Sequence, residues 1–328
     1  MKISVAIATY NRAGMVREAI AAALAQSRAP DEIVVTDDAS SDGTCAELDQ
    51  WSRRDARVRV IRQPVNSGGV ANWNTAMTAA TGDVIAWCSD DDRFMPGHLR
   101  ASLEYLEAHP EIGMVHSSFV DVCETPQGTV EQARLLRSAR PLVTDRQNLL
   151  RYMTRYYDWP FHPSTLVMRR EVWDRTAPFD PRYALADTDW FMRAVEEFPV
   201  AMLPRYGVFN RRHGGNWSNR VGSARMQAEI FEIVERAILR RWPRSGPRRV
   251  CWRALWRANV RARLWLTVRA RIRSGHENAA GAAWSTLTQA TGTRALEWLE
   301  APGQWWIQRS VARMEAGRPE ARASVRPL

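Results

Sequence analysis

Residues 83–96 read DVIAWCSDDDRFMP, an apolar run typical of a buried strand that leads directly into three adjacent carboxylates, Asp90, Asp91 and Asp92. Like charges side by side repel one another, so a folded chain spreads them into solvent or supplies a cation. Mg²⁺ and Mn²⁺ favour carboxylate oxygens, and Mg²⁺ typically uses one or two of them with phosphates and water. The alternative is a solvated acidic turn that caps a helix near Gly97. The triplet by itself favours neither.

The same arrangement of a strand followed by polar residues occurs twice upstream, at TYNR (9–12) and DDASSDG (37–43). We expect strands at Ile3–Thr9, Glu32–Asp37 and Val58–Arg62, and helices at 13–26, 44–54 and from 66 onward. Strand and helix alternate, which predicts an α/β fold with a mainly parallel sheet flanked by helices. Ligands of such sheets bind beyond the carboxyl ends of the strands. Because the polar clusters fall at those ends, we expect them to share one site.

The second half of the chain gives a less regular pattern. We expect strands at 111–122 and 164–170, a polar loop or flap at 124–140, a helix at 187–198, a strand and turn at 200–213, and helices beyond residue 219. The mixture of strands and helices continues the α/β pattern up to about residue 220.

Charge divides the chain near the same place. Residues 220–328 hold 21 Arg and 8 Asp or Glu, a net charge of +13, whereas the whole chain has 46 bases, 36 acids and a net charge of +10. The first 219 residues therefore carry −3. We expect one domain at 1–220, divided into halves of about 1–110 and 111–220, and a basic, Trp-rich helical extension at 221–328.

Composition excludes several classes of protein. With 45% hydrophobic and 25% charged residues in 328, the chain has the composition of a globular protein. Its four cysteines lack the paired spacing of a zinc site or a disulfide framework, which favours a reducing compartment. Neither a signal-like segment nor an apolar stretch of membrane-spanning length is apparent. We expect a cytoplasmic protein, with peripheral contact to the inner face of the membrane as a further hypothesis.

Two upstream clusters suit a nucleotide. Asp37 and Asp38 stand where a carboxylate accepts hydrogen bonds from a base or a ribose hydroxyl, although the following polar residues are also ordinary helix caps. The glycines of NSGGVANWN (66–74) allow close backbone approach near a helix N-terminus, a place suited to phosphate. By itself such a pair of glycines is more often a turn.

Taken together, these motifs resemble the family 2 glycosyltransferases with the GT-A fold. The resemblance is carried, in order, by SVAIATYNR (4–12), VVTDDASSDGT (34–44), NSGGVANWN (66–74), SDDDRFMPGHL (89–99), FDPRYALADTDWFMR (179–193) and NRRHGGNWS (210–218). It covers roughly residues 1–220 and leaves the extension unmatched. It implies a Mg²⁺- or Mn²⁺-dependent, inverting transfer of a sugar from a nucleoside-diphosphate sugar to an acceptor hydroxyl, in bacterial polysaccharide, glycolipid or glycoconjugate biosynthesis.

The resemblance also implies roles for matching residues. The nucleotide-sugar site would comprise Thr9, Tyr10, Arg12, Asp38, Asn66, Gly68, Asn72 and Asp90. Asp91 would be the principal metal ligand, with Asp92 and His213 as further ligands. Ser89 stands where the family pattern has its first Asp, which leaves open what completes the coordination.

The general base is expected at Asp187, the second residue of the pair Ala186–Asp187, with Asp189 in reserve. An acceptor hydroxyl is a poor nucleophile, so a carboxylate within reach must take its proton as the new bond forms. The alternative for Asp187 is a helix cap, and for His213 an ordinary loop histidine.

An aromatic segment, YDWPFHPST (157–165), lies where members of the family close the site toward the acceptor. Trp159 and His162 would stack on a sugar or a lipid-linked acceptor, or are core aromatics beside a proline turn. A UDP-sugar is the first expectation for the donor, and a glycan or lipid-linked molecule for the acceptor.

The extension at 221–328 combines Arg stripes with tryptophans at helical spacing. It would lie on an anionic membrane, self-associate, or pack on the catalytic domain. No nucleic acid partner is expected, because no nucleic-acid motif accompanies the charge. Two other functions stay open: a nucleotide-sugar-binding protein without activity, and a membrane- or nucleic-acid-docking module.

Overall fold

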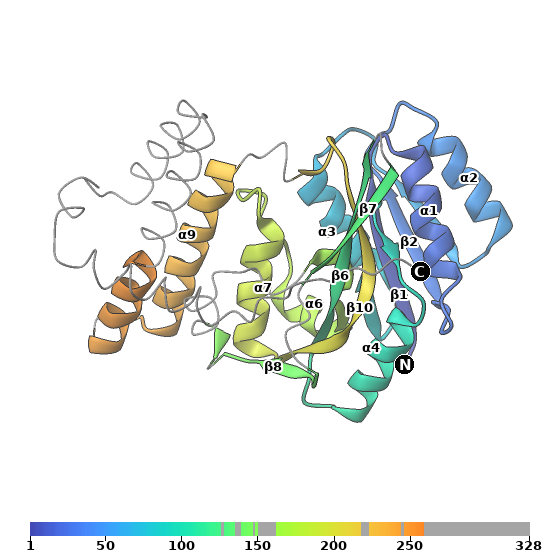
Figure 1. Ribbon diagram of the computed structural model, residues 1–328. Coiled ribbons are helices and arrows are strands. Elements are labelled where there is room, and N and C mark those ends of the chain that lie inside the picture. Colours follow the sequence, from blue (N-terminus) through green and yellow to red (C-terminus); the bar gives the residue numbers. More distant parts are fainter. Residues whose placement is uncertain are drawn as a thin grey trace. The chain divides into compact units, whose positions relative to one another are not determined.

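A computed structural model of the chain describes residues 1–125, 128–134, 139–146, 148–149, 162–217, 223–243 and 246–258 (Figure 1). The chain divides into two compact units, Met1–Arg253 and Ala254–Leu328. Everything below concerns the first unit. The domain boundary expected near residue 220 stays a prediction.

A single mixed sheet runs through this unit in the order β3-β2-β1-β4-β9-β6-β10-β5, with β7 added to β6 and β8 to β10. The strands are β1 (Ile3–Thr9), β2 (Glu32–Asp37), β3 (Val58–Arg62), β4 (Val84–Trp87), β5 (Arg93–Phe94), β6 (Met114–Thr125), β7 (Gly128–Arg134), β8 (Leu142–Thr144), β9 (Val167–Arg169) and β10 (Val200–Arg212). The first four are mutually parallel, and β6 and β10 form a second parallel pair. The short β9 is antiparallel to both β4 and β6 and joins the two parts. The α/β fold with a central sheet flanked by helices is confirmed, and the sheet is mixed, with parallel pairing among β1–β4 and between β6 and β10.

Helices cover both faces of the sheet. They are α1 (Ala13–Leu24), α2 (Thr44–Arg54), α3 (Gly69–Ala79), α4 (His98–Ala108), α6 (Arg170–Thr176), α7 (Ala186–Glu197) and α9 (Ser223–Arg241), with a 3₁₀ turn at Pro163–Thr165. In Figure 1, α1 and α2 lie to one side of the strands and α3, α6 and α7 to the other. The helix α9 packs against α7.

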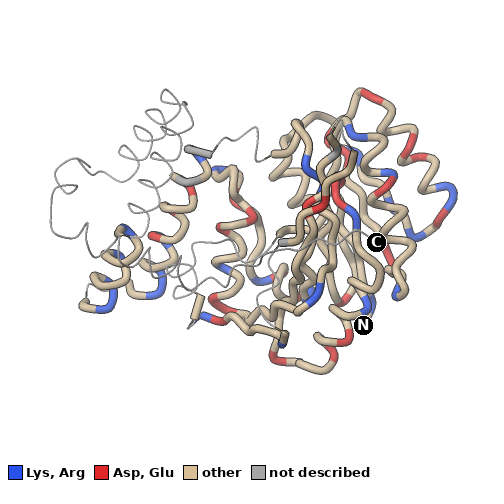
Figure 2. The backbone as a smooth tube through the Cα atoms, viewed as in Figure 1, with Lys and Arg blue, Asp and Glu red and all other residues tan. Residues whose placement is uncertain are grey.

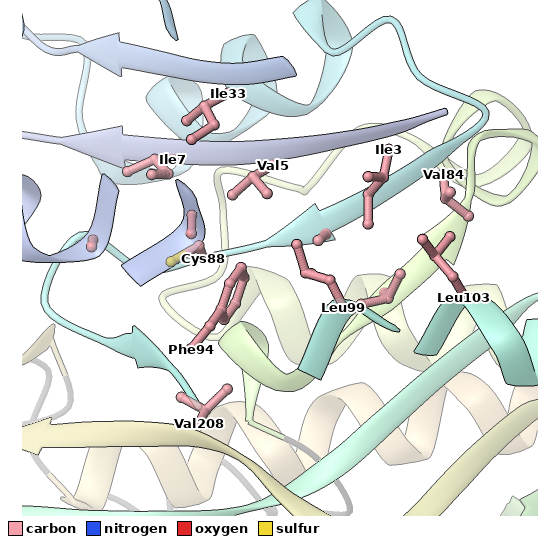
Figure 3. Close-up of a cluster of buried hydrophobic side chains, with 14 of the residues drawn as sticks. Ile3, Val5, Ile7, Ile33, Val84, Cys88, Phe94, Leu99, Leu103 and Val208 are labelled. Carbon is pink, nitrogen blue, oxygen red and sulfur yellow. The ribbon is translucent and has the colours of Figure 1, made fainter. Parts of the chain in front are cut away.

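Alternation along the strands separates two cores. In β1, Ile3, Val5 and Ile7 are buried on the face that α1 and α4 cover, together with Leu99 and Phe94 (Figure 3). The other face carries a group of aromatic rings in mutual contact from β4, α3, α6, α7 and the segment between α6 and α7: Trp73, Trp87, Trp173, Phe179 and Trp190. Burial of such large apolar side chains on both faces fixes the strand register, because a slip by one residue would move the side chains of each core to the opposite face, where the packing does not fit them.

The segment expected as a loop or flap at 124–140 is in part a strand, so that expectation was wrong. Strand β6 continues to Thr125, and Gly128–Arg134 returns antiparallel beside it. Gly128, at φ +120°, adopts backbone geometry that favours glycine. The exposed residues described in β7 present no apolar face, so the strand carries none of the alternation by which strands are recognised. The strand expected at 164–170 is shorter than predicted, because α6 begins at Arg170.

Within the part of the chain described above, no helix has both the length and the apolar character needed to cross a bilayer.

Candidate active site

The three carboxylates after β4 lie at the carboxyl ends of the parallel strands, where acidic and basic residues come together (Figure 2). The Asp92 N–H donates to the Ser89 carbonyl at 3.1 Å, which closes a tight turn. The Ser89 N–H in turn donates to the Ser164 hydroxyl at 2.9 Å. The turn gives each aspartate its own surroundings, so the three are not equivalent.

Asp91 is where distant segments meet. Its Oδ2 accepts a hydrogen bond from Arg12 Nη1 at 2.8 Å and one from Asn216 Nδ2 at 3.2 Å, and lies 3.1 Å from His213 Nε2. The structure therefore brings together Arg12, Asp91 and His213, as expected from the sequence. Asn216 was not predicted from the sequence, although it lies three residues after His213 in the motif HGGN (213–216).

Asp90 is almost completely buried and shares the Arg12 guanidinium, whose Nη1 lies 2.7 Å from its Oδ1. Burial raises the pKa of Asp90 above its usual range, while Arg12 counteracts the rise. Arg12 is thus a cation that offsets the charge of two neighbouring carboxylates.

Asp92 has different partners. Its buried carboxyl accepts hydrogen bonds from the Ser164 hydroxyl and, at 3.2 Å, from the Arg211 backbone N–H. Burial raises the pKa of Asp92 well above its usual range, and the neighbouring Asp91 adds to the rise. These contacts tie the segment after β4 to β10 and hold the Asp92 carboxyl in place, while its role as a metal ligand stays a prediction.

The donor atoms fit a metal only in part. Among the described residues, no three His, Cys, Asp or Glu side chains are arranged to hold a metal ion. Asp91 and His213 face each other, and two protein ligands suffice for Mg²⁺ when a diphosphate and water supply the others. The Gly215 N–H donates to His213 Nδ1 at 3.1 Å, so a neutral His213 carries its proton on Nε2. To bind a metal through Nε2, His213 must give up the hydrogen bond from the Gly215 N–H, whereas Asp91 must exchange contacts that its Oδ2 makes with Arg12, His213 or Asn216.

The segment that carries Arg12 is fixed by neighbouring loops. Arg12 precedes α1, and its backbone N–H donates to the Thr44 hydroxyl at 2.9 Å. Asn11, in the left-handed region at φ 52°, accepts the Ser41 N–H at 2.8 Å. Tyr10 stands exposed beside it. The turn thus presents Arg12 toward Asp91.

Asp38 organises the loop before α3. Its Oδ1 accepts the Ser67 N–H at 2.7 Å and the Ser67 hydroxyl at 2.8 Å, and its Oδ2 accepts the Gly68 N–H at 2.9 Å. Gly68 has φ +88°, which favours glycine, and Asn66 Oδ1 lies 3.2 Å from the same N–H. A carboxylate has about four lone-pair positions, so Asp38 keeps capacity for a further donor.

Asn72 lies beneath this loop. Its Nδ2 donates to the backbone carbonyls of Thr9 at 3.1 Å and Thr36 at 3.0 Å. It is buried and holds the ends of β1 and β2 together. Thr9 is buried as well, so both residues support the site from within the sheet.

Asp187 is the second residue of α7. Its Oδ1 accepts the Thr188 N–H at 2.7 Å. Burial raises the pKa of Asp187 to about 6, the Thr188 hydrogen bonds oppose the rise, and the like charge of Glu229 adds to it. A carboxylate with a pKa near 6 is ionised at neutral pH and is a stronger base than an ordinary aspartate. Asp189 is instead buried and paired with Arg193 at 2.9 Å, which gives it a structural role.

Asp187 is linked to the Asp91 cluster through one loop. The loop 213–217 contacts Asp91 through His213 and Asn216, and Trp217 Nε1 donates to the Ala184 carbonyl at 2.9 Å. Ala184 stands three residues before Asp187. The loop 213–217 therefore contacts Asp91 directly and also contacts the segment that leads to Asp187.

Of the two predicted acceptor residues, the structure describes only His162. Trp159 lies outside the described residues. His162 packs against Phe119, with ring centroids 4.9 Å apart, and its Nδ1 lies 3.6 Å from Asp92 Oδ2. Burial lowers the pKa of His162 to about 4, so it is neutral.

Comparison with known sequences settles the family. The model of glycosyl transferase family 2 matches residues 4–175, which is more than half of the chain. This chain belongs to glycosyl transferase family 2. Its relatives include an uncharacterized glycosyltransferase of Nostoc sp., 30% identical over 188 residues, 55% of each chain. They also include the uncharacterized glycosyltransferase YwdF of Bacillus subtilis, 29% identical over 231 residues, 69% of this chain and 81% of YwdF. The chain thus spans about half the length of the Nostoc relative.

Solved structures share the GT-A fold of this family member. Residues 1–349 of TarS from S. aureus superpose with a TM-score of 0.59 at 18% identity, over 79% of this chain and 71% of that one. The mannosyltransferase PcManGT from Pyrobaculum calidifontis, solved with GDP-Man and Mn²⁺, gives a TM-score of 0.54 at 19% identity, over 96% and 84%. At such identities the likeness concerns the fold alone.

Proposed function

We propose that the protein is a metal-dependent, inverting glycosyltransferase that moves a sugar from a nucleoside-diphosphate sugar to an acceptor hydroxyl. One observation carries this proposal: Arg12, His213 and Asn216 converge on Asp91 at the carboxyl ends of the parallel strands. The loop that provides two of these groups also contacts the segment before Asp187. Inversion is taken from the family resemblance.

The proposed reaction assigns a proton transfer to Asp187. Its carboxylate accepts the acceptor's hydroxyl proton while the acceptor oxygen forms a bond to the anomeric carbon. The bond between that carbon and the diphosphate oxygen breaks, and the nucleoside diphosphate leaves with the electron pair. Mg²⁺ or Mn²⁺ at Asp91 would stabilise the negative charge of the leaving group. Arg12, already 2.8 Å from Asp91, would turn its guanidinium toward the same phosphates.

The donor proposal rests on chemistry and on structural neighbours. TarS has been solved with UDP and with UDP-GlcNAc, and PcManGT with GDP-Man, so both are nucleotide-sugar proteins. We infer a nucleoside-diphosphate sugar for this chain, with a UDP-sugar as the first candidate. The loop fixed by Asp38 would receive the nucleoside, because Asp38 keeps acceptor capacity there.

The acceptor is proposed to be a glycan or a lipid-linked sugar. One relative, 31% identical over 104 residues, is the putative teichuronic acid biosynthesis glycosyltransferase TuaG of Bacillus subtilis. This supports a role in bacterial polysaccharide or glycoconjugate synthesis. A cytoplasmic location, with contact to the inner face of the membrane through 221–328, belongs to the same proposal.

A thermal-shift screen tests the function directly. UDP, GDP and the corresponding sugar nucleotides are added with Mn²⁺ or with a chelator, and the melting temperature is measured. We expect a Mn²⁺-dependent increase with at least one nucleotide, abolished by Asp91→Asn and retained by Asp174→Asn, an exposed acid on α6. Release of nucleoside diphosphate in the presence of acceptor is then assayed. Nucleotide binding without such release would identify a binding protein, and no shift with any nucleotide would refute the proposal.

A further inference from the structure

Three consecutive residues before α7 are each held from outside that helix. The contacts are Tyr183 Oη to Glu232 Oε1 at 3.0 Å, Trp217 Nε1 to the Ala184 carbonyl at 2.9 Å, and the Leu185 N–H to Glu229 Oε2 at 2.8 Å. Two of the three come from α9, which begins 48 residues after the family match ends at residue 175. Glu229 and Glu232 are three positions apart and therefore share one face of α9. This face of α9 therefore accepts hydrogen bonds from Tyr183 and Leu185, shortly before the proposed base.

Glu229 is the most constrained member of this group. It is buried, its Oε2 accepts the Leu185 N–H, and its Oε1 lies 2.9 Å from Arg225 Nε. Leu185 is the cap residue immediately before α7, and its carbonyl accepts the N–H groups of Thr188 and Asp189, each at 3.1 Å. Fixing the Leu185 amide therefore fixes the first turn of α7.

The charge of Glu229 acts on the same place. Burial is the main reason why the pKa of Asp187 is raised, and the like charge of Glu229 contributes in the same direction. The other charged groups around this turn are mostly held in ion pairs. Arg225, which is mostly exposed, pairs with Glu229 itself, and Glu232 pairs with Arg236 on the same helix. On α7, Asp189 pairs with Arg193, and on the loop 213–217, His213 faces Asp91.

We propose that Glu229 is a positioning residue for the transfer reaction. By accepting a hydrogen bond from the Leu185 N–H, it orients Asp187. This inference rests on the proposed function, in which Asp187 takes the acceptor's proton. It makes α9 a part of the active site although the helix lies outside the matched domain. Removing the Glu229 charge while keeping an acceptor oxygen separates its electrostatic effect from its structural one.

The test compares Glu229→Gln and Glu229→Ala with Glu196→Gln. Glu196 makes another ion pair between α7 and α9, with Arg240 at 3.1 Å, at the opposite end of α7 from Asp187. The pH profile of kcat/KM is measured, and the Asp187 carboxyl is titrated by ¹³C NMR with Asp187→Asn as assignment control. We expect Glu229→Gln to shift the acid limb and the NMR titration to lower pH, because a like charge is removed. Glu229→Ala should also lower kcat by about 10- to 100-fold through misplacement of the base.

Other outcomes overturn the inference. If Glu229→Ala keeps the kcat of the wild type, and the Asp187 titration is the same in Glu229→Gln as in the wild type, Glu229 does not act on Asp187. The same holds if Glu196→Gln shifts the profile equally, because the effect would then be a general loosening of α9. The NMR titration needs no turnover: a shifted titration in a protein that transfers no sugar would refute the proposed function and leave the coupling intact.

Discussion

Replacing Asp187 with Asn should abolish activity and stabilise the protein. The Asp187 pKa rises from an ordinary value of 3.8 to about 6, so the folded state binds this proton more tightly than the unfolded state. Stability from this group is present below pH 4 and is lost as the pH rises through 6. A shift of this size corresponds to at most about 3 kcal/mol. Because Asp187 is only partly buried, we expect a gain of about 1–3 kcal/mol for Asn at pH 8, or ~3–8 °C in Tm.

Activity should move in the opposite direction. Asn cannot take a proton, and loss of a general base typically costs about 10²–10⁴-fold in rate. In the wild type the same group predicts an acid limb in kcat/KM near pH 6, with activity rising above it. The Asn side chain keeps an oxygen to accept the Thr188 N–H, so the helix start should be preserved.

Two measurements check this prediction: Tm by calorimetry at pH 4 and pH 8, and release of nucleoside diphosphate with an acceptor. Asp189→Asn is the matched control, because it breaks a buried ion pair in the same helix and should lower Tm with little loss of activity. The reasoning would be refuted if Asp187→Asn lowered Tm at pH 8, or if it kept turnover within tenfold of the wild type.

Three further changes test the rest of the site. Arg12→Ala should lower the free energy of unfolding in chelator by about 3 kcal/mol, because it leaves buried carboxylates uncompensated, and should enlarge the Tm gain with Mn²⁺. An unchanged Mn²⁺ response would contradict the role of Arg12 as the resident cation. Asp38→Ala should lower the free energy of unfolding by about 2 kcal/mol, because it releases the 66–68 loop, and should also remove the stabilisation by nucleotide. Calorimetric titration with UDP detects the loss of nucleotide binding. Gly207→Ala should cost about 1–3 kcal/mol in denaturant unfolding, because its Cβ would overlap with the buried His98 ring; a variant as stable as wild type would show that the ring moves freely.

Local patterns predicted the fold and the edge of the sheet at which polar residues gather. Strands β1, β2, β3 and β4 and the helices between them follow from apolar runs and helical spacing, and the polar residues after the strands lie at one edge of the sheet, whose function is a proposal. Strand β7 was missed because its stability comes from pairing with β6, and its exposed residues carry no apolar signal.

The sequence alone determined that Arg12, Asp91 and His213 are candidates, because short motifs at strand ends are local features. The family resemblance already assigned the three carboxylates different roles, but only the tertiary structure gave their partners: Asp90 and Asp91 contact Arg12, and Asp92 accepts a hydrogen bond from the Ser164 hydroxyl. The deciding contacts join residues far apart in the chain: 79 positions for Arg12 and Asp91. Leu185 and Glu229 are 44 positions apart. Residue type and local spacing carry no information about such pairs, since packing of the sheet and of α9 brings them together.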